Sequence, residues 1–498
     1  MAIVQTTYGK LDGLERDGAG WFSGGGAHHA FLGIPFASPP PRFHAPEPPQ
    51  PWEGVRPAQQ FEKSAPQGDH PIQGFASSTP RDEDCLYLNV YTPAPDGAKR
   101  PVMFWIHGGG YTHGAGSEDL YDGGPLAVRG DVVVVTIHYR LGALGFADFE
   151  DVIEGARCNV GLLDMVRALE WTRDNIEAFG GDPSNITIFG ESAGAAAVGA
   201  LLATASARGL FAKAILESGS GRATPQADAV KIREALLKQL GIEPADAAAI
   251  LDRPWQEIVE AQHKIGMRYG PVIDADVIPE APLDAIAAGR SSNVPVLIGT
   301  NRDEVKLFNA TSRDRHITDE DLPAAIAREM PRASEDDAKR LIEVYRASRS
   351  SKGLPAANVD IFDGITTDLR FRVNAQRLAL STRANGQPAF VYLFTWESPA
   401  RHGAFGSCHA LEMPFVFGTL WAPTQDRFAG SGPEAEALSL RMMDSWLAFA
   451  RSGDPSHEGV GEWPPFEAET RPTMILGREV TLEHDPFAEE RQAIEAFV

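Results

Sequence analysis

The feature that most constrains the fold is the sequence Gly-Glu-Ser-Ala-Gly at residues 190–194, which lies between two segments of different character. The apolar, β-branched run at 186–189 predicts a strand, and the small residues at 193–202 predict a helix. A G-x-S-x-G sequence that joins a strand to a helix is typical of a nucleophile elbow, a tight turn that exposes its serine. The two glycines fit this turn because a side chain at either position would crowd the bracketing strand or helix. We therefore expect Ser192 to act as a nucleophile.

Further apolar runs extend this pattern into a sheet. They have the character of strands buried on both faces, and they lie at 102–106, 132–137, 294–298 and 389–394. A helical apolar periodicity between 162 and 179 ends at two glycines. Alternating strands and helices predict an α/β fold with a large, mostly parallel central sheet flanked by helices. Helix-rich insertions are expected at about 223–283 and 317–373, over the active site. Since no linker divides the chain, we expect one catalytic domain across 1–498.

The charge and cysteine content exclude several classes of protein. Acidic residues outnumber basic ones by 68 to 45, and the net charge of −23 disfavours nucleic acid or an anionic membrane surface as a partner. There is no run of 18 apolar residues and no Sec-type signal. The odd set Cys85, Cys158 and Cys408 is typical of a reducing compartment, so we expect a cytoplasmic protein. No metal-ligand spacing is present. The oligomeric state stays open, and a monomer is compatible with the sequence.

A serine nucleophile needs a base and a group that orients the base. In this type of fold the acid and then the histidine follow the serine along the chain. The acid is expected just after the strand at 294–298, where Asp303 and Glu304 are consecutive, and the residues alone leave both open. A solvated acidic loop is the alternative interpretation of this segment.

The histidine is expected after the strand at 389–394. His409 is flanked by apolar residues, as a base shielded from bulk water would be. His402 lies between polar and glycine neighbours in an expected loop, and His457 lies in another. We therefore favour His409 as the base.

The sequence also predicts an oxyanion hole. Residues 107–110 read His-Gly-Gly-Gly and directly follow the strand at 102–106, where such a loop presents backbone N–H groups to the substrate. One such donor contributes a factor of about 10² to 10³ to kcat. The alternative is a glycine-rich loop without a catalytic role.

Taken together, these motifs resemble those of the type B carboxylesterases, the cholinesterase-like branch of the α/β-hydrolases, and in particular the bacterial p-nitrobenzyl esterase group. The resemblance covers nearly the whole chain. It rests on residues 31–43, 83–90, 105–110, 139–142, 159–164, 189–194, Trp446 and 453–455. It implies an α/β-hydrolase fold and a carboxylester hydrolase that acts on small to medium esters without metal or cofactor.

The resemblance also assigns roles to individual residues. The motif at 299–305 favours Glu304 over Asp303 as the acid, and the motif at 409–418 contains the histidine. The implied catalytic triad is Ser192, His409 and Glu304. The implied oxyanion donors are Gly109, Gly110 and Ala193, with supporting residues Glu191, Ser218 and Glu412. Two buried structural ion pairs are implied as well, Arg42 with Glu83 and Arg140 with Asp164.

The sequence departs from the family pattern at several positions. No cysteine precedes Cys85, so the disulfide of many secreted members cannot form. Val305 and Cys158 stand where glycine is usual. A count without gaps places Phe75 where cholinesterases have their choline-binding tryptophan, which disfavours a quaternary ammonium substrate. The same machinery could instead hydrolyse carbamates or activated amides, and a non-catalytic binding module is the alternative from another class.

Overall fold

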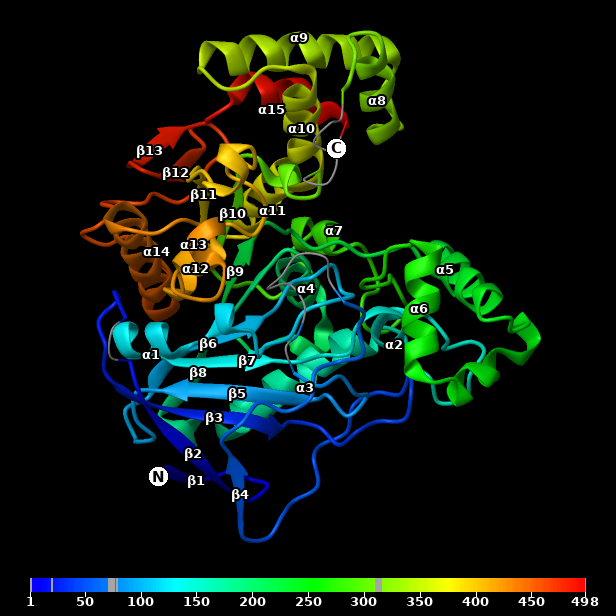
Figure 1. Cartoon of the computed structure of the whole chain (residues 1–498), viewed down its shortest axis with the longest axis vertical. Coiled ribbons are helices and arrows are strands. Elements are labelled where there is room, and N and C mark those ends of the chain that lie inside the picture. Colours follow the sequence, from blue (N-terminus) through cyan, green and yellow to red (C-terminus); the bar gives the residue numbers. More distant parts are fainter. Residues whose placement is uncertain (1, 19–20, 70–76, 78, 310–315, 498) are drawn as a thin grey trace.

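One large sheet organises the molecule. The computed structural model describes residues 2–18, 21–69, 77, 79–309 and 316–497. In these residues, 13 strands form a sheet in the order β1-β2-β3-β5-β7-β6-β8-β9-β10-β11-β12-β13, with β4 beside β2 (Figure 1). The strands are β1 (Ala2–Gln5), β2 (Lys10–Asp17), β3 (Ala27–Pro35), β4 (Val55–Ala58), β5 (Tyr87–Thr92), β6 (Arg100–Ile106), β7 (Val133–Ile137), β8 (Gly181–Glu191), β9 (Lys213–Glu217), β10 (Val296–Asn301), β11 (Ala389–Phe394), β12 (Pro472–Leu476) and β13 (Val480–His484).

The central part of the sheet is parallel, as the sequence predicts. From β7 through β6, β8, β9, β10 and β11 to β12, every neighbouring pair is parallel. The N-terminal strands and β13 add antiparallel edges. The strand expected at 294–298 continues to Asn301, which brings the acidic pair that follows close to the carboxyl edge of the sheet. Ligand sites of open α/β sheets form at this edge.

Helices cover both faces of the sheet (Figure 1). They are α1 (Gly124–Gly130), α2 (Gly142–Phe146), α3 (Val160–Asn175), α4 (Ala193–Ala203), α5 (Gln226–Gln239), α6 (Trp255–Ile265), α7 (Pro282–Ala287), α8 (Asp321–Glu329), α9 (Glu335–Ser351), α10 (Asn358–Thr367), α11 (Val373–Ala384), α12 (Met413–Phe417), α13 (Gln425–Phe428), α14 (Pro433–Ser452) and α15 (Ala488–Ile494). None of these described helices is both long and apolar enough to cross a bilayer.

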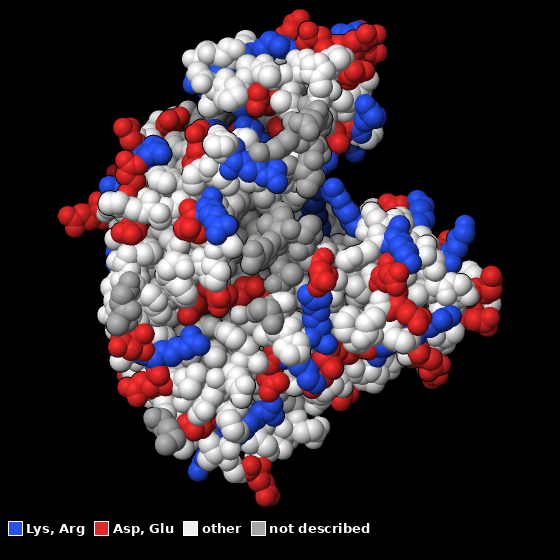
Figure 2. Space-filling model, in the orientation of Figure 1, with Lys and Arg blue, Asp and Glu red and all other residues white. Residues whose placement is uncertain are grey.

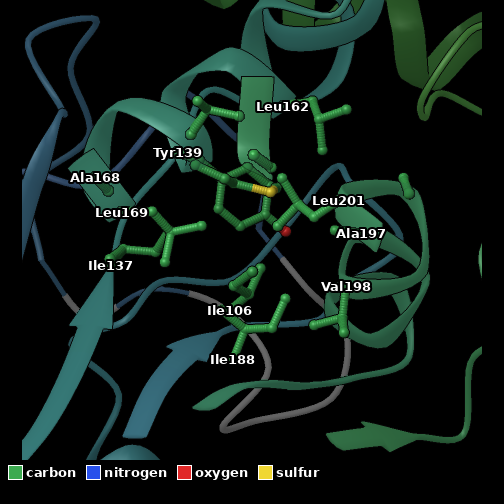
Figure 3. Close-up of a cluster of buried hydrophobic side chains, with 14 of the residues drawn as sticks. Ile106, Ile137, Tyr139, Leu162, Ala168, Leu169, Ile188, Ala197, Val198 and Leu201 are labelled. Atoms are coloured by element: carbon green, nitrogen blue, oxygen red, sulfur yellow. The ribbon is translucent and has the colours of Figure 1, made fainter. Parts of the chain in front are cut away.

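The side chains of each central strand alternate between two hydrophobic cores. In β6, Phe104 and Ile106 belong to the core that includes α3 and α4, whereas Met103 and Trp105 belong to the core that includes α12 and α14. Figure 3 shows the first core, in which strand residues face Leu162 and other apolar side chains of the two helices. Burial of each large apolar side chain stabilises the fold by about 1.5–3 kcal/mol.

Two groups of helices lie apart from the helices that cover the sheet directly. Helices α5 and α6 pack on each other and extend to one side of the sheet (Figure 1). Helices α8, α9 and α10 form a group with its own hydrophobic cluster, which also contains Ile494 of α15. Figure 2 shows that the molecular surface is indented between these two helical groups.

Candidate active site

Ser192 lies in a strained turn between β8 and α4. Its backbone has φ 56° and ψ −117°, a conformation that a non-glycine residue adopts at a cost of about 1–3 kcal/mol. Its N–H donates to the carbonyl oxygen of Glu217 at 2.8 Å. A Cβ on Gly190 would lie 2.6 Å from the carbonyl oxygen of Ile106, and one on Gly194 would lie 2.0 Å from the same oxygen. Both glycines are therefore required for the close approach of β6 to the turn.

His409 and Glu304 lie together at the carboxyl edge of the sheet. Nδ1 of His409 is 2.6 Å from Oε2 of Glu304, and both side chains are buried. Glu304 begins the short 3-10 turn η5 (Glu304–Lys306) after β10, and His409 lies in the loop between β11 and α12. The backbone N–H of Asn301 donates to Oε1 of Glu304 at 2.7 Å. The Glu304 carboxylate is thus fixed on both oxygens.

Asp303 faces a different environment from its neighbour Glu304. Its carboxylate forms ion pairs with Arg302 at 2.9 Å, Lys306 at 3.4 Å and Arg349 at 3.5 Å. Burial opposes ionisation of Asp303, but these three cations outweigh burial and hold its pKa below the usual range. The structure therefore places Asp303 in a charge cluster and Glu304 on the imidazole.

The two other candidate histidines lie apart from this arrangement. His402 is exposed in the short turn at 400–403. Nε2 of His457 lies 3.1 Å from both the Ser445 hydroxyl and the carbonyl oxygen of Arg441, on α14. Neither histidine is brought to Glu304 by these contacts.

The second nitrogen of His409 faces Glu191. Nε2 lies 3.1 Å from Oε1 of Glu191, and neither atom has a hydrogen-bond partner among the described residues. Burial lowers the pKa of His409, but the charges of Glu191 and Glu304 outweigh burial and raise it to about 9. Burial raises the pKa of Glu191 to about 8, against the opposing effect of the His409 charge. Nε2 is therefore available as a proton acceptor once the imidazole is neutral.

Further buried polar groups surround the pair. The Ser218 hydroxyl donates to Oε1 of Glu412 at 3.1 Å, and Nδ2 of Asn301 donates to Oε2 of Glu412 at 2.5 Å. Burial, followed by the charge of Glu304, raises the pKa of Glu412 to about 7. Burial also raises the pKa of Glu217, which accepts a hydrogen bond from the Trp446 indole at 2.8 Å. Sequence reasoning named Ser218 and Glu412 but missed Asn301 and Glu217.

The glycine loop after β6 lies against the nucleophile. A Cβ on Gly108 would lie 3.3 Å from Cβ of Ser192, which shows how closely the loop approaches the elbow. Gly109 has φ 103° and Gly110 has φ 63°, and a Cβ on Gly109 would lie 2.2 Å from the carbonyl oxygen of His113. No described residue accepts a hydrogen bond from the N–H groups of Gly109, Gly110 or Ala193. These donors are free to bind a developing oxyanion.

Two aromatic rings flank the imidazole. The rings of Phe308 and Phe371 have centroids 5.0 Å and 5.1 Å from that of His409. Phe371 belongs to the π-helix η6 (Asp368–Arg372), inside the second helical insertion, and no local motif points to either ring. Phe75, the expected counterpart of the choline-binding tryptophan, lies outside the described residues.

The two implied structural ion pairs differ in burial. Arg140 and Asp164 are both buried, and Asp164 accepts hydrogen bonds from Nη2 at 2.6 Å and from Nε at 2.9 Å. Arg42 and Glu83 form a similar bidentate pair at 2.6 Å and 2.7 Å. However, the Glu83 side chain is 35% exposed, so the expectation that this second pair is buried is wrong for Glu83. The pair forms near the surface because Glu83 lies in the loop before β5.

The chemistry of the site is that of nucleophilic catalysis by side chains. Among the described residues, no group of three His, Cys, Asp or Glu is arranged to hold a metal ion. Cys85, Cys158 and Cys408 are all free and buried. A half-buried serine on a strained turn, a buried histidine–carboxylate pair and unpaired N–H groups point to acyl transfer.

Comparisons with known proteins agree with this chemistry. A model of the carboxylesterase family matches residues 1–494. The para-nitrobenzyl esterase of Bacillus subtilis (strain 168) is 40% identical over 99% of this chain and 98% of its own length. The phenmedipham hydrolase of Pseudarthrobacter oxydans is 35% identical over 96% of this chain and 95% of its own length.

Solved structures show the same likeness in three dimensions. A carboxylesterase from Geobacillus stearothermophilus superposes with a TM-score of 0.87 at 38% identity, covering 99% of this chain and 100% of its own. A PNB esterase superposes with a TM-score of 0.86 at 38% identity, covering 99% of both chains. The sheet and the elbow define a serine hydrolase with the α/β-hydrolase fold, as the sequence predicts. The chain belongs to the carboxylesterase family, type B, and is similar to the bacterial para-nitrobenzyl esterases.

Proposed function

We propose that Ser192, His409 and Glu304 form the catalytic triad of a carboxylester hydrolase. The observation that carries this proposal is the 2.6 Å contact between Nδ1 of His409 and Oε2 of Glu304. A carboxylate at Nδ1 holds the imidazole in the tautomer whose Nε2 accepts a proton, and it stabilises the imidazolium that forms. The strained elbow at Ser192, between β8 and α4, supplies the nucleophile.

The reaction proceeds through an acyl-enzyme. The Ser192 oxygen attacks the ester carbonyl while Nε2 of His409 takes the hydroxyl proton. The negative charge of the tetrahedral intermediate is stabilised by the N–H groups of Gly109, Gly110 and Ala193. His409 then passes its proton to the leaving alcohol, and the acyl group stays on Ser192. Water, deprotonated by the same Nε2, releases the carboxylic acid and restores the serine.

Supporting roles follow from the contacts of the buried carboxylates. Glu191 lies 3.1 Å from Nε2 of His409 and stabilises its positive charge. Glu412 links Ser218 with Asn301, whose backbone binds Glu304. We assign these residues to the positioning of the imidazole and its carboxylate, without contact with the reacting ester bond.

The substrate class is small to medium carboxylic esters. The relatives named as esterases support this choice. Activated amides differ from esters in the leaving group, and carbamates carry a nitrogen atom on the carbonyl carbon, but both have a carbonyl that the same triad can attack. The ratio of rates for a matched ester and amide distinguishes the two.

The experiment that tests the function is hydrolysis of p-nitrophenyl esters from acetate to dodecanoate. The wild-type enzyme is expected to be most active on short or medium acyl chains, and Ser192→Ala is expected to lack this activity. If no ester is hydrolysed above the rate of the variant, the protein is not an esterase.

We further propose that the enzyme works in the cytoplasm on a small-molecule ester. Cys85, Cys158 and Cys408 are buried and form no disulfide with one another, which is typical of a reducing compartment. Fractionation of cells that express the natural gene tests this location, and recovery outside the cytoplasm would contradict it.

A further inference from the structure

Two side chains of the second helical insertion bind the turn at 302–305, which carries the proposed catalytic acid and which we call the acid turn. Nη2 of Arg372 donates to the carbonyl oxygen of Arg302 at 3.0 Å. The backbone N–H of Val305 donates to the Thr367 hydroxyl at 3.4 Å. The two hydrogen bonds therefore hold the acid turn at both of its ends. Neither side chain takes part in the proton transfers of the proposed reaction.

A π-helix brings these two side chains toward the same face. Arg372 ends η6 (Asp368–Arg372), and Thr367 directly precedes it. The N–H of Val373 donates to the carbonyl oxygen of Asp368, which is the i→i+5 bond of a π-helix. In a regular α-helix, residues five apart point in directions about 140° apart around the axis. The wider turn of the π-helix brings Thr367 and Arg372 nearer to one face, where both contact the acid turn.

Arg372 is itself fixed within a buried cluster. Its Nη1 lies 2.8 Å from Oδ1 of Asp368, and Oδ2 of Asp368 accepts a hydrogen bond from the Tyr345 hydroxyl of α9 at 2.6 Å. The guanidinium carbon lies 5.1 Å from the ring centroid of Phe487. The Arg372 side chain is 11% exposed and that of Asp368 is 2% exposed. Because the planar guanidinium is already oriented by the carboxylate and the ring, it loses little further freedom when it binds the acid turn.

The acid turn contacts His409 through both backbone and side chain. The carbonyl oxygen of Glu304 accepts a hydrogen bond from the N–H of His409 at 3.2 Å, in addition to the 2.6 Å contact between the side chains. Phe371, which directly precedes Arg372, has its ring centroid 5.1 Å from that of the imidazole. A displacement of the acid turn would therefore move the carboxylate and the imidazole relative to Ser192. A misplacement of about 1 Å can lower the rate of a catalysed reaction about 10²-fold.

We propose that Arg372 and Thr367 are positioning residues that hold the Glu304 carboxylate against the imidazole of His409. Both act through the acid turn and not on the ester itself. Arg372 is expected to contribute more than Thr367, because a hydrogen bond from a charged group is stronger than one between neutral groups. The inference rests on the proposed triad, and it makes the second helical insertion a part of the catalytic machinery.

The test measures kcat for p-nitrophenyl butyrate per folded enzyme, with the folded fraction determined by circular dichroism. Arg372→Gln removes the guanidinium that binds the acid turn. Thr367→Val keeps the shape of the side chain but removes the acceptor of the Val305 N–H, whereas Thr367→Ser keeps a hydroxyl. The control is Arg370→Gln, which removes the same charge from the same π-helix. Arg370 pairs with Glu329 of α8 at 2.6 Å and serves as a partly exposed counterpart of Arg372.

We expect Arg372→Gln to lower kcat about tenfold or more, because the acid turn loses its charged donor. Thr367→Val is expected to lower kcat about three- to tenfold, the effect of one lost hydrogen bond. Thr367→Ser is expected to retain most of the wild-type kcat. Arg370→Gln is expected to change kcat less than about twofold, because a partly exposed ion pair contributes little.

The same substitutions combined with Glu304→Gln show whether the two residues act through the acid. In that background we expect Arg372→Gln and Thr367→Val each to lower kcat less than about twofold, because the carboxylate that they position is absent. A purely structural role would lower the folded fraction in both backgrounds and leave kcat per folded enzyme unchanged. The difference between the two backgrounds therefore separates positioning from stability.

The outcomes distinguish this proposal from the proposed function. Unchanged kcat in Arg372→Gln and Thr367→Val, or equal losses with and without the Glu304 carboxylate, would overturn the positioning proposal and leave the esterase proposal intact. If Arg372→Gln does not fold, the comparison of Thr367→Val with Thr367→Ser decides the question alone. If Glu304→Gln by itself retains the wild-type kcat, or if the wild-type enzyme hydrolyses no ester, the proposed triad or the esterase function fails, and the positioning proposal fails with it.

Discussion

The carboxylate of Glu304 lies 2.6 Å from Nδ1 of His409, although 105 positions separate the two residues in the chain. Asp303, the immediate neighbour of Glu304, instead pairs with the three cations Arg302, Lys306 and Arg349. The two consecutive acids in the turn after β10 therefore have different roles. Glu304 orients the imidazole, and Asp303 connects η5 to the helical insertion through Arg349.

These different roles predict different effects for two conservative substitutions, one on kcat and the other on stability. Glu304→Gln is expected to lower kcat by about 10³ to 10⁴, because the amide no longer stabilises the imidazolium or fixes its tautomer. Asp303→Asn is expected to lower the free energy of unfolding, because it weakens the contacts to Arg302, Lys306 and Arg349, while kcat stays within about tenfold. Steady-state kinetics and urea unfolding of both variants check this. A larger loss of kcat in Asp303→Asn would show that the assignment is reversed.

The glycine loop gives a second prediction. In Gly109→Ala the new Cβ would lie 2.2 Å from the carbonyl oxygen of His113, so the loop must move. Its N–H groups then no longer point toward the oxyanion. We expect kcat to fall by about 10² or more, the effect of losing an oxyanion donor. Gly54→Ala is the control, because Gly54 has a similar positive φ of 76° but no atom within 4 Å of an added Cβ. Equal activity of the two variants would contradict the proposed role of the loop.

The pH dependence of the reaction depends on Glu191. The nearby carboxylates raise the pKa of His409 to about 9, and the imidazole must lose its proton before it can act as a base. The acidic limb of kcat/KM is therefore expected above the ordinary histidine range. Glu191→Gln removes an anion that favours the imidazolium, so the pKa of His409 falls and the limb moves to lower pH. A pH profile of kcat/KM measures this, and a limb that stays in place or moves to higher pH is inconsistent with the proposed interaction.

The ion pairs predict a difference in stability. Asp164→Asn leaves the charge of Arg140 buried without a counterion, and we expect the free energy of unfolding to fall by about 3–5 kcal/mol. Glu83→Gln affects a pair whose carboxylate is 35% exposed, so we expect a loss nearer 1 kcal/mol. Equilibrium denaturation of both variants gives the two values. Equal losses of unfolding free energy in the two variants would mean that burial of the ion pair does not determine how much its disruption destabilises the protein.

Five central strands of the sheet (β6, β7, β8, β10 and β11) and the elbow could be predicted from local sequence. The runs at 102–106 and 389–394 are buried on both faces, so their apolar composition identifies them without any long-range information. The elbow at Ser192 is equally local, because its glycines are required by contacts within the turn and with the next strand. The ends of these strands shifted, as for β10, which continues to Asn301. The strands β1 to β5, β9, β12 and β13 were not predicted.

The partners of the site could not be predicted from local sequence. From the residues alone, Asp303 and Glu304 were equivalent, and only the resemblance favoured Glu304. Their environments are set by residues far along the chain, namely His409 for one acid and Arg349 for the other. Phe308 and Phe371 were missed for the same reason, since their contact with the imidazole depends on how the insertion packs.

The central claim is that Ser192 is the nucleophile of an esterase. The most direct measurement is mass spectrometry of the protein after reaction with a fluorophosphonate, followed by peptide mapping. The account predicts one phosphonyl group per chain, located on Ser192, with loss of ester hydrolysis in proportion to labelling and no labelling of Ser192→Ala. Labelling at another residue, or full hydrolysis by the labelled protein, would contradict it.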